Sequence, residues 1–232
     1  MINKFSYLIL FIAIVIYALK YQEMTALDCS QAGKDLPVEV HLEMPDPDLN
    51  TDLSYAQITQ KFRNYHHGRG AGAFMQALGV TEFSMDVRFQ MKYTEKRKTI
   101  SGQVCLIPQK IDVMMNLAQT IYLGNPSTRS KCQFKTLMGH EMRHVKINRD
   151  VSQSKIKTFE ESVRQGVASF GQYQGWGPYE ASDSQAKKDL LTEYMNSSIG
   201  RAIKETEKEI NGLQSKVDTP EEYLRIGRSC RW

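Results

Sequence analysis

The segment Gly139-His140-Glu141-Met142-Arg143-His144 lies in a proline-free stretch of the chain that runs from 133 to about 171. Apolar residues recur along this stretch at steps of three to five residues, which is typical of a helix that buries one face. The pattern therefore predicts a single helix of about 38 residues. The elements on either side of it decide what covers its apolar face.

Residues on the N-terminal side of this helix predict a sheet. Apolar and polar residues alternate over 38–43 and, without exception, over 83–93, which is the pattern of a half-buried strand. Two more strands are expected at 99–107 and 110–122, and a short helix is expected at 55–64. Because these strands follow one another with short turns, they predict an antiparallel meander.

Residues on the C-terminal side predict further helices. The segment 171–178 interrupts the first helix, a second long helix is expected at 184–215, and Thr219 followed by Pro220 predicts the capped start of a short one. The expected fold class is therefore α+β: a small antiparallel sheet packed on the long helix that carries the histidines, with a C-terminal helical extension. The expected division is 22–35 as a linker, 36–178 as the main domain and 179–232 as the extension.

Composition excludes several classes of protein. The chain has 232 residues, 24% of them charged and 41% hydrophobic, which is ordinary for a globular protein and unlike a disordered chain, a collagen or a multi-span membrane protein. Its 30 Lys and Arg against 26 Asp and Glu give a net charge of +4. That excess is too small to indicate nucleic-acid binding, so no nucleic-acid partner is expected.

The N-terminus predicts export. Lys4 precedes an apolar run over 5–19, and Lys20 follows it. This is the layout of a secretory signal, and 1–21 is expected to be either a cleaved signal peptide or an inner-membrane anchor. The rest of the chain is then extracytoplasmic, either periplasmic or secreted.

The cysteines agree with an oxidising compartment. The chain has four of them, Cys29, Cys105, Cys132 and Cys230, and an even number in an exported protein favours two disulfides. Three connectivities are possible. The pairing expected here is Cys105 with Cys132, and Cys29 with Cys230.

The sequence His140-Glu141-Met142-Arg143-His144 matches the pattern H-E-x-x-H. Residues four apart project from the same helix face, so both imidazoles can bind one zinc ion. Glu141 is turned about 100° away and is expected beside the ion, as the general base on zinc-bound water. The sequence therefore predicts a zinc-dependent metallopeptidase with a peptide or protein substrate.

The third zinc ligand stays open at this point. Candidates come from the continuation of the helix, from a second helix returning antiparallel across Pro178, and from a glycine-rich loop. They are Asp150, Glu160, Glu161, Glu205, Glu209, His66 and His67.

The chain resembles a bacterial family of exported zinc-dependent proteases that is catalogued as a domain of unknown function. The resemblance covers roughly 36–170: a short helix over 53–59, a Gly-Val-Thr entry at Gly79 to an alternating strand, a strand with Cys105, and H-E-x-x-H on a long helix. It implies zinc ligation by His140 and His144 and catalysis by Glu141. It does not cover 184–232.

A different function is also consistent with the sequence. The two long helices could form a hairpin that binds a protein partner, in a non-catalytic envelope protein whose metal site is vestigial or structural. Metal removal would separate the two functions, because a structural site loses its fold and an open catalytic site loses activity first.

Overall fold

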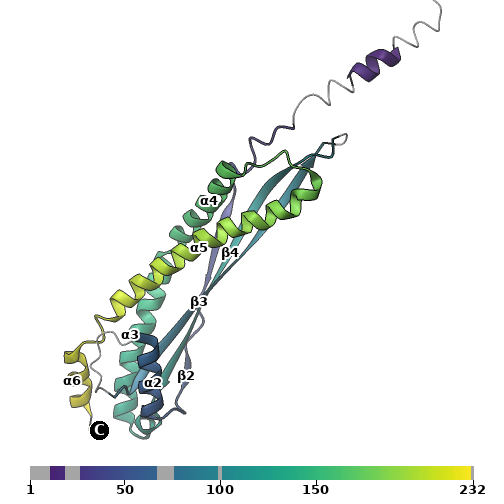
Figure 1. Cartoon of the computed structure of the whole chain (residues 1–232). Coiled ribbons are helices and arrows are strands. Elements are labelled where there is room, and N and C mark those ends of the chain that lie inside the picture. Colours follow the sequence, from purple (N-terminus) through teal and green to yellow (C-terminus); the bar gives the residue numbers. More distant parts are fainter. Residues whose placement is uncertain (1–10, 19–26, 67–75, 99–100, 231–232) are drawn as a thin grey trace, which may run out of the picture. The chain divides into compact units, whose positions relative to one another are not determined.

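The structure, a computed structural model, describes residues 11–18, 27–66, 76–98 and 101–230 (Figure 1). It contains both helices and a small sheet, and it confirms the α+β class. The regular elements, in chain order, are β1 (Val38–Glu43), β2 (Asp48–Asn50), α2 (Tyr55–His66), β3 (Gly79–Arg97), β4 (Val104–Leu123), α3 (Lys131–Ser154), α4 (Ile156–Tyr173), α5 (Ser184–Gln214) and α6 (Pro220–Ser229). Two short 3-10 helices, Asn125–Arg129 and Ala181–Asp183, precede α3 and α5.

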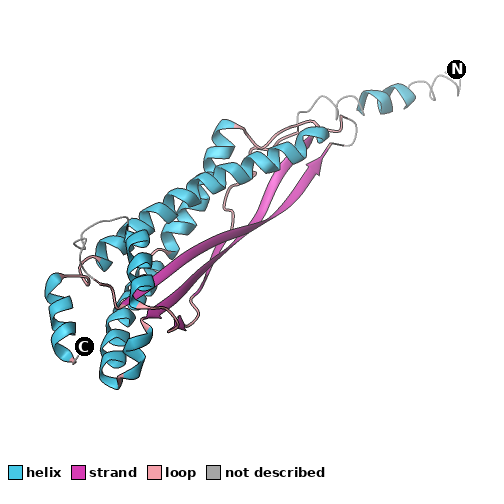
Figure 2. Ribbon diagram, turned by 60° about the horizontal axis from the view of Figure 1, so that its bottom comes forward, coloured by secondary structure: helices cyan, strands magenta, loops and turns pink. Residues whose placement is uncertain are grey.

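Strand β4 is the centre of the sheet, because β1, β2 and β3 all pair with it. Figure 2 draws the strands of this sheet in magenta. The connection between β3 and β4 is too short for a crossover, so these two long strands are antiparallel neighbours. Strand β2 instead runs parallel to β4, with Leu49 opposite Ile121, so the sheet is mixed rather than wholly antiparallel.

The strands expected at 99–107 and 110–122 are one strand, and the prediction of a turn between them was wrong. Pro108 lies within β4. Its fixed φ is compatible with extended backbone, and its missing N–H removes one ladder hydrogen bond without ending the strand. Alternate residues of β4 from Ile111 to Leu123 are buried, which gives the sheet its covered face.

The helix expected over 133–171 is two helices, because Lys155 separates α3 from α4. Lys155 has φ −91° and ψ −2°, and its N–H donates to the carbonyls of both Val151 and Ser152. The hydroxyl of Ser154 also donates to the Val151 carbonyl, at 2.7 Å. A serine hydroxyl that competes with a backbone N–H for a helical carbonyl bends a helix, and the Ser154 hydroxyl does so directly before the interruption.

The chain forms two compact units, each built from three stretches. Unit 1 comprises 1–38, 90–111 and 163–197. Its core is apolar and aromatic: the Phe170 ring lies 5.0 Å from the Trp176 ring and 5.9 Å from the Tyr194 ring. Leu191 and Met195 on α5 are fully buried in the same unit.

Unit 2 comprises 39–89, 112–162 and 198–232. Its core lies where β4, α3 and α6 meet, and a cluster of buried apolar residues fills it: Ile121, Leu123, Leu137, Val145 and Ile226. Each unit therefore has a core of its own. The predicted boundary between 178 and 179 stays a prediction.

The disulfides join Cys29 with Cys105 in unit 1 and Cys132 with Cys230 in unit 2. The expected pairing of Cys105 with Cys132, and of Cys29 with Cys230, was wrong. Each observed disulfide links segments that pack in the same unit, which sequence order does not show. Two disulfides and no free cysteine indicate an oxidising, extracytoplasmic environment.

Within the residues that the structure describes, no helix has both the length and the apolar character needed to cross a membrane. Residues 11–18 of the N-terminal apolar run are helical and exposed. The rest of that run lies outside the described residues, so its role as a signal or an anchor stays a prediction.

Candidate metal centre

Helix α3 presents the H-E-x-x-H residues to the interior of unit 2. It begins at the N-cap Ser130, whose side chain accepts a hydrogen bond from the Gln133 N–H. His140, Glu141 and His144 are only 4%, 3% and 5% exposed. Ionisable side chains are rarely this deeply buried unless they have partners or bind a metal, so their partners decide what the site is.

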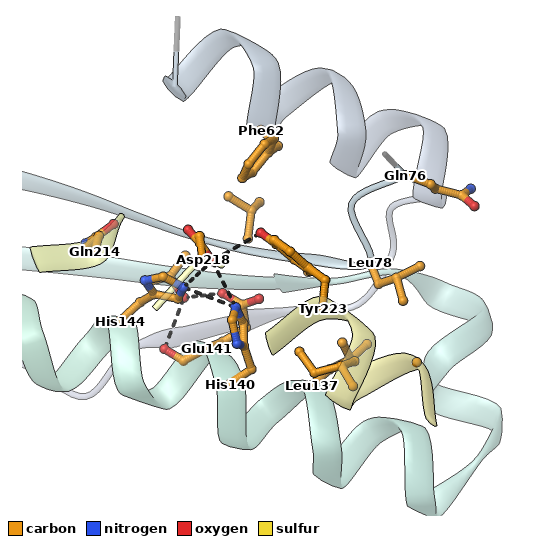
Figure 3. Close-up of a pocket in the computed structure, with 15 residues that line it drawn as sticks. Phe62, Gln76, Leu78, Leu137, His140, Glu141, His144, Gln214, Asp218 and Tyr223 are labelled. Atoms are coloured by element: carbon orange, nitrogen blue, oxygen red, sulfur yellow. Dashed lines mark hydrogen bonds and ion pairs between the residues drawn. The ribbon is translucent and has the colours of Figure 1, made fainter. Parts of the chain in front are cut away.

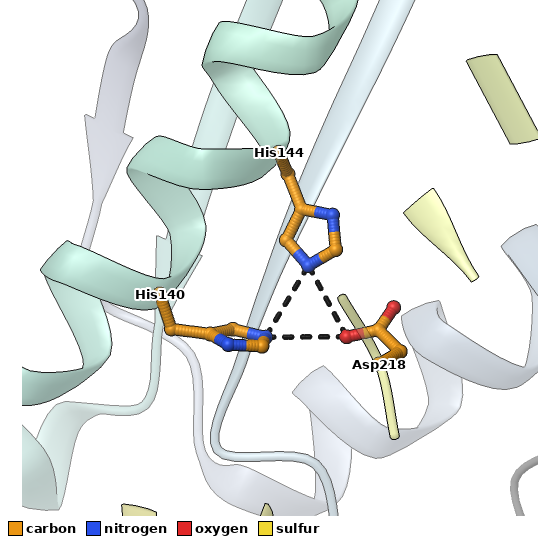
Figure 4. A group of neighbouring side chains, drawn as sticks. All are labelled: His140, His144 and Asp218. Carbon is orange, nitrogen blue, oxygen red and sulfur yellow. Dashed lines mark hydrogen bonds and ion pairs between the residues drawn. The ribbon is translucent and has the colours of Figure 1, made fainter. Parts of the chain in front are cut away.

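The predicted pair His140 and His144 meets a third side chain, Asp218, which lies between α5 and α6 (Figure 4). The Nε2 atoms of the two histidines are 3.2 Å apart. One carboxylate oxygen of Asp218 lies 3.2 Å from the Nε2 of His140 and 3.2 Å from the Nε2 of His144. Three lone-pair donors therefore converge on one point.

This triangle has the dimensions of a metal site. Ligands placed tetrahedrally at about 2.0 Å from a zinc ion lie about 3.3 Å from one another. The three edges here are each 3.2 Å. Two imidazoles and one carboxylate are also a ligand set that divalent transition metals accept, and three protein ligands leave the fourth position open. The group can therefore hold a metal ion.

His140 has a carboxylate behind it. Its Nδ1 lies 3.3 Å from Oε1 of Glu222, the arrangement that commonly orients a metal-binding histidine. Arg225 and Arg143 contact Glu222, and the hydrogen bond from Arg225 first of all lowers the pKa of Glu222 to about 2. The Nδ1 of His144 has no hydrogen-bond partner among the described residues. The two histidines are thus held differently.

Local structure explains why Asp218 reaches the histidines. Its N–H donates to the carbonyl of Gln214 at the end of α5, at 3.2 Å. The next residue, Thr219, is the N-cap of α6 and accepts a hydrogen bond from the Glu222 N–H at 3.2 Å. The predicted Thr-Pro cap is confirmed. Asp218 is therefore fixed between the end of one helix and the cap of the next.

A chain of buried amides holds the same corner. Asn148 lies on α3 one turn after His144 and donates to Oε1 of Gln119 on β4, at 2.9 Å. The side-chain amide of Gln214 in turn donates to Asn148. All three residues are buried. The chain links strand, histidine helix and the end of α5, and so it fixes the backbone from which Asp218 extends.

Glu141 lies beside the metal group but is not part of it. The hydroxyl of Thr81 on β3 donates to its carboxylate at 2.8 Å. A Cβ on Gly79 would lie 2.6 Å from the other carboxylate oxygen, so only glycine lets β3 approach this closely. Sequence reasoning identified Glu141 but gave no signal for Thr81, because the strand and the helix meet only in the fold.

The environment shifts the two carboxylates of the site in opposite directions. Burial raises the pKa of Glu141 above its usual value. Burial alone would do the same to Asp218, but its hydrogen bonds with His140 and His144 outweigh that effect and lower the pKa of Asp218. Two neighbouring carboxyl groups with separated pKa values are suited to different roles, an anionic ligand and a proton-transfer group.

A cavity of about 150 Å³ opens beside these residues (Figure 3). His140, Glu141, His144 and Asp218 form one part of its wall, and Tyr223, whose hydroxyl donates to Asp218 at 3.1 Å, covers them. Burial raises the pKa of Tyr223, and the Asp218 carboxylate adds to this, so the phenol stays protonated. The site therefore has room for a small group next to the converging ligand atoms.

None of the predicted third ligands joins this group among the described residues. Asp150 pairs with Lys146 on the surface of α3, and Glu209 pairs with Lys155 at 2.5 Å. Glu160 and Glu161 lie on α4, and Glu205 is exposed on α5. The side chain of His66 and the whole of His67 lie outside the described residues.

The prediction of an antiparallel second helix was correct, but its register was not. Glu209 faces Lys155, so the position opposite His144 falls near 220 rather than at 205–212. That position is past the end of α5, in the turn that carries Asp218. The sequence held one signal for this ligand: Asp218 directly precedes Thr219, and Thr219 already caps α6, so the aspartate is not needed as a cap.

Comparisons of this chain with models of protein families, with curated proteins and with solved structures found no match.

Proposed function

We propose that this protein is a zinc-dependent metallopeptidase that hydrolyses peptide bonds in the periplasm or outside the cell. The observation that carries the proposal is Glu141: a carboxylate only 3% exposed, held by Thr81 beside three converging ligand atoms without being one of them. A site that only stabilised the fold would not need this extra carboxylate, whose burial costs free energy.

Each residue has a definite part in this reaction. His140, His144 and Asp218 would hold the zinc ion, and Glu222 would orient His140. Zinc in such a site supplies a Lewis acid that lowers the pKa of water to about 7 and polarises a carbonyl group. Glu141 takes a proton from the attacking water and passes it to the leaving amine. Thr81 keeps the Glu141 carboxylate directed into the cavity while it does so.

One observation favours the second candidate, a structural metal site in a partner-binding protein. All three ligands are largely covered, and the Cys132–Cys230 disulfide ties α6 to the helix that carries the histidines. A metal that tied these cross-linked helices together would add to the stability of the fold. The cavity beside the group favours catalysis instead, because a structural site has no use for it.

The substitution Glu141→Gln separates these functions. We expect the purified variant to keep its zinc, measured by mass spectrometry, and to lose about 10²- to 10⁴-fold in hydrolysis of a fluorogenic peptide library. Glu161→Gln, an exposed glutamate on α4, is the matched control and should keep full activity. Full activity in Glu141→Gln would contradict the mechanism. No hydrolysis by the zinc-loaded wild-type protein, together with unfolding on chelation, would favour the structural site.

A further inference from the structure

We propose that the cavity beside the metal group binds one uncharged apolar side chain of the substrate, and so selects peptides with a leucine- to phenylalanine-sized residue next to the cleaved bond. The inference rests on the proposed function and adds a substrate class to it. Three features of the cavity carry it: its walls, its size and its charge.

The walls of the cavity differ from one side to the other. Figure 3 shows Leu78 and Leu137 on one side of His140, and Gln214 on the other side, beyond His144. Leu137 and Val80 are 2% and 4% exposed, so the apolar wall is part of the core and not a loose surface. Phe62 and Ile226 complete the apolar lining. A substrate carbonyl at the metal group therefore places its neighbouring side chain against hydrocarbon.

The size of the cavity limits which side chain fits. Its volume is about 150 Å³. A cavity of about this volume lined by Leu, Ile and Phe accepts a benzene molecule. Side chains from leucine to phenylalanine therefore fill the cavity, and alanine leaves most of it empty.

The charge of the cavity excludes other side chains of the right size. None of its described lining residues is Lys or Arg, so an acidic side chain against the apolar wall would find no basic side chain and would face Asp218 and Glu141. A lysine ammonium would have to lose its water against the leucines, and the Asp218 carboxylate that could attract it is already engaged by His140 and His144. Only an uncharged side chain avoids both costs.

Gly227 offers a way to change the cavity without disturbing the fold. It lies on α6 and lines the cavity, and a Cβ added there meets nothing within 4 Å. A larger side chain at this position therefore starts from open space at the edge of the cavity, and we expect Gly227→Leu to narrow it. Gly212 on α5 is also open and exposed, but it does not line the cavity, so Gly212→Leu is the matched control.

The test measures hydroxamates, which bind zinc directly and need no catalysis. N-acetylated amino-acid hydroxamates with Gly, Ala, Leu, Phe, Asp and Lys side chains are titrated into the zinc-loaded full-length protein. We expect the Leu and Phe compounds to bind roughly ten- to a hundredfold more tightly than the Gly compound, and the Asp and Lys compounds to bind no better than Gly. Gly227→Leu should reduce the Phe-to-Gly affinity ratio at least tenfold, and Gly212→Leu should leave it unchanged.

The possible failures are distinguishable. Equal affinity for all six hydroxamates, or a preference for Asp or Lys, would overturn the apolar selection and leave the metallopeptidase proposal standing. An unchanged ratio in Gly227→Leu would overturn the assignment of the cavity as the selecting pocket. Zinc-loaded protein that binds none of the hydroxamates would overturn both proposals together.

Discussion

The two units solve the same folding problem with different interiors. Unit 1 buries hydrocarbon and aromatic rings, and Ser184 is its one polar residue among the described buried residues. Unit 2 buries His140, Glu141 and His144 together with a chain of amides. Each unit has one disulfide. The cross-links are therefore alike, and the interiors are not.

This difference separates an interior that only stabilises the fold from one that also carries a candidate functional site. Burying a polar or ionisable group costs free energy unless the group finds a partner. Unit 2 buries many such groups, and unit 1 buries very few. Concentrated burial of ionisable groups beside a cavity is typical of a functional site. Unit 1 is expected to respond to substitution in stability alone, and unit 2 in both stability and metal binding.

The largest expected effect is loss of the metal ion itself. His140→Ala combined with His144→Ala should reduce bound zinc from about one per chain to none. Asp218→Ala alone should weaken binding by more than the roughly 100-fold that is lost with a residue that only orients a metal ligand. Zinc content by mass spectrometry and a competition titration with a chelator measure both. Asp150→Ala, which removes an exposed carboxylate of the same helix, is the control. Undiminished binding in Asp218→Ala would show that Asp218 is not the third ligand.

Removing each disulfide in turn tests whether the cross-link in unit 2 supports zinc binding as well as stability, while the cross-link in unit 1 supports stability alone. Their sequence separations are 76 and 98 residues. The chain-entropy contributions therefore differ by only about 0.2 kcal/mol, and removing either pair of cysteines, by serine substitution, should cost about 2–4 kcal/mol in the free energy of unfolding. Only loss of Cys132–Cys230, which joins α3 to α6, should also weaken zinc binding. Equal zinc affinity in both variants would break the comparison.

The chain of buried amides in unit 2 should support both the stability of the fold and the affinity for zinc. Asn148→Leu leaves the amides of Gln119 and Gln214 without their shared partner, so we expect a loss of about 1–3 kcal/mol in stability. Because Gln214 fixes the backbone of Asp218, zinc affinity should fall about tenfold or more. Asn211→Leu, an exposed change on α5, is the control. A stability loss with unchanged zinc affinity would limit Asn148 to a structural part.

The smallest effect is expected in unit 1, at an ion pair. Glu95 accepts hydrogen bonds from Lys188 at 2.8 Å and from Ser184 at 2.5 Å, and these lower its pKa to about 2. A lowered carboxyl pKa gives stability above its unfolded value, near 4.5, and that stability is lost as the pH falls toward 2. Glu95→Gln should therefore be less stable than wild type at pH 7, by less than about 1 kcal/mol for a partly exposed pair.

Measuring denaturant unfolding of both proteins between pH 7 and pH 2 checks this expectation. The difference between them should shrink as the pH falls below about 4.5 and vanish near pH 2. The zinc affinity of Glu95→Gln should equal that of wild type at pH 7. A change in zinc affinity would mean that unit 1 is not independent of the site.

Sequence patterns predicted best the elements that depend only on neighbouring residues. Alternation identified β3, and the Thr219–Pro220 signal located the start of α6. It failed where two signals compete. Pro108 indicated a break that extended backbone tolerates. The segment around Ser154 and Lys155 has no proline or glycine, although α3 ends there.

The sequence by itself determined that two histidines and a glutamate share one helix, because spacing along a helix fixes which side chains lie on the same face. Tertiary structure alone decided the third ligand, the disulfide pairing and the cavity. Asp218 is 74 residues from His144, and their contact depends on the break at Lys155, the register of α5 and the turn before α6. A small change in any of these three features would move the Asp218 carboxylate away from the histidines. No local sequence pattern shows their combined effect.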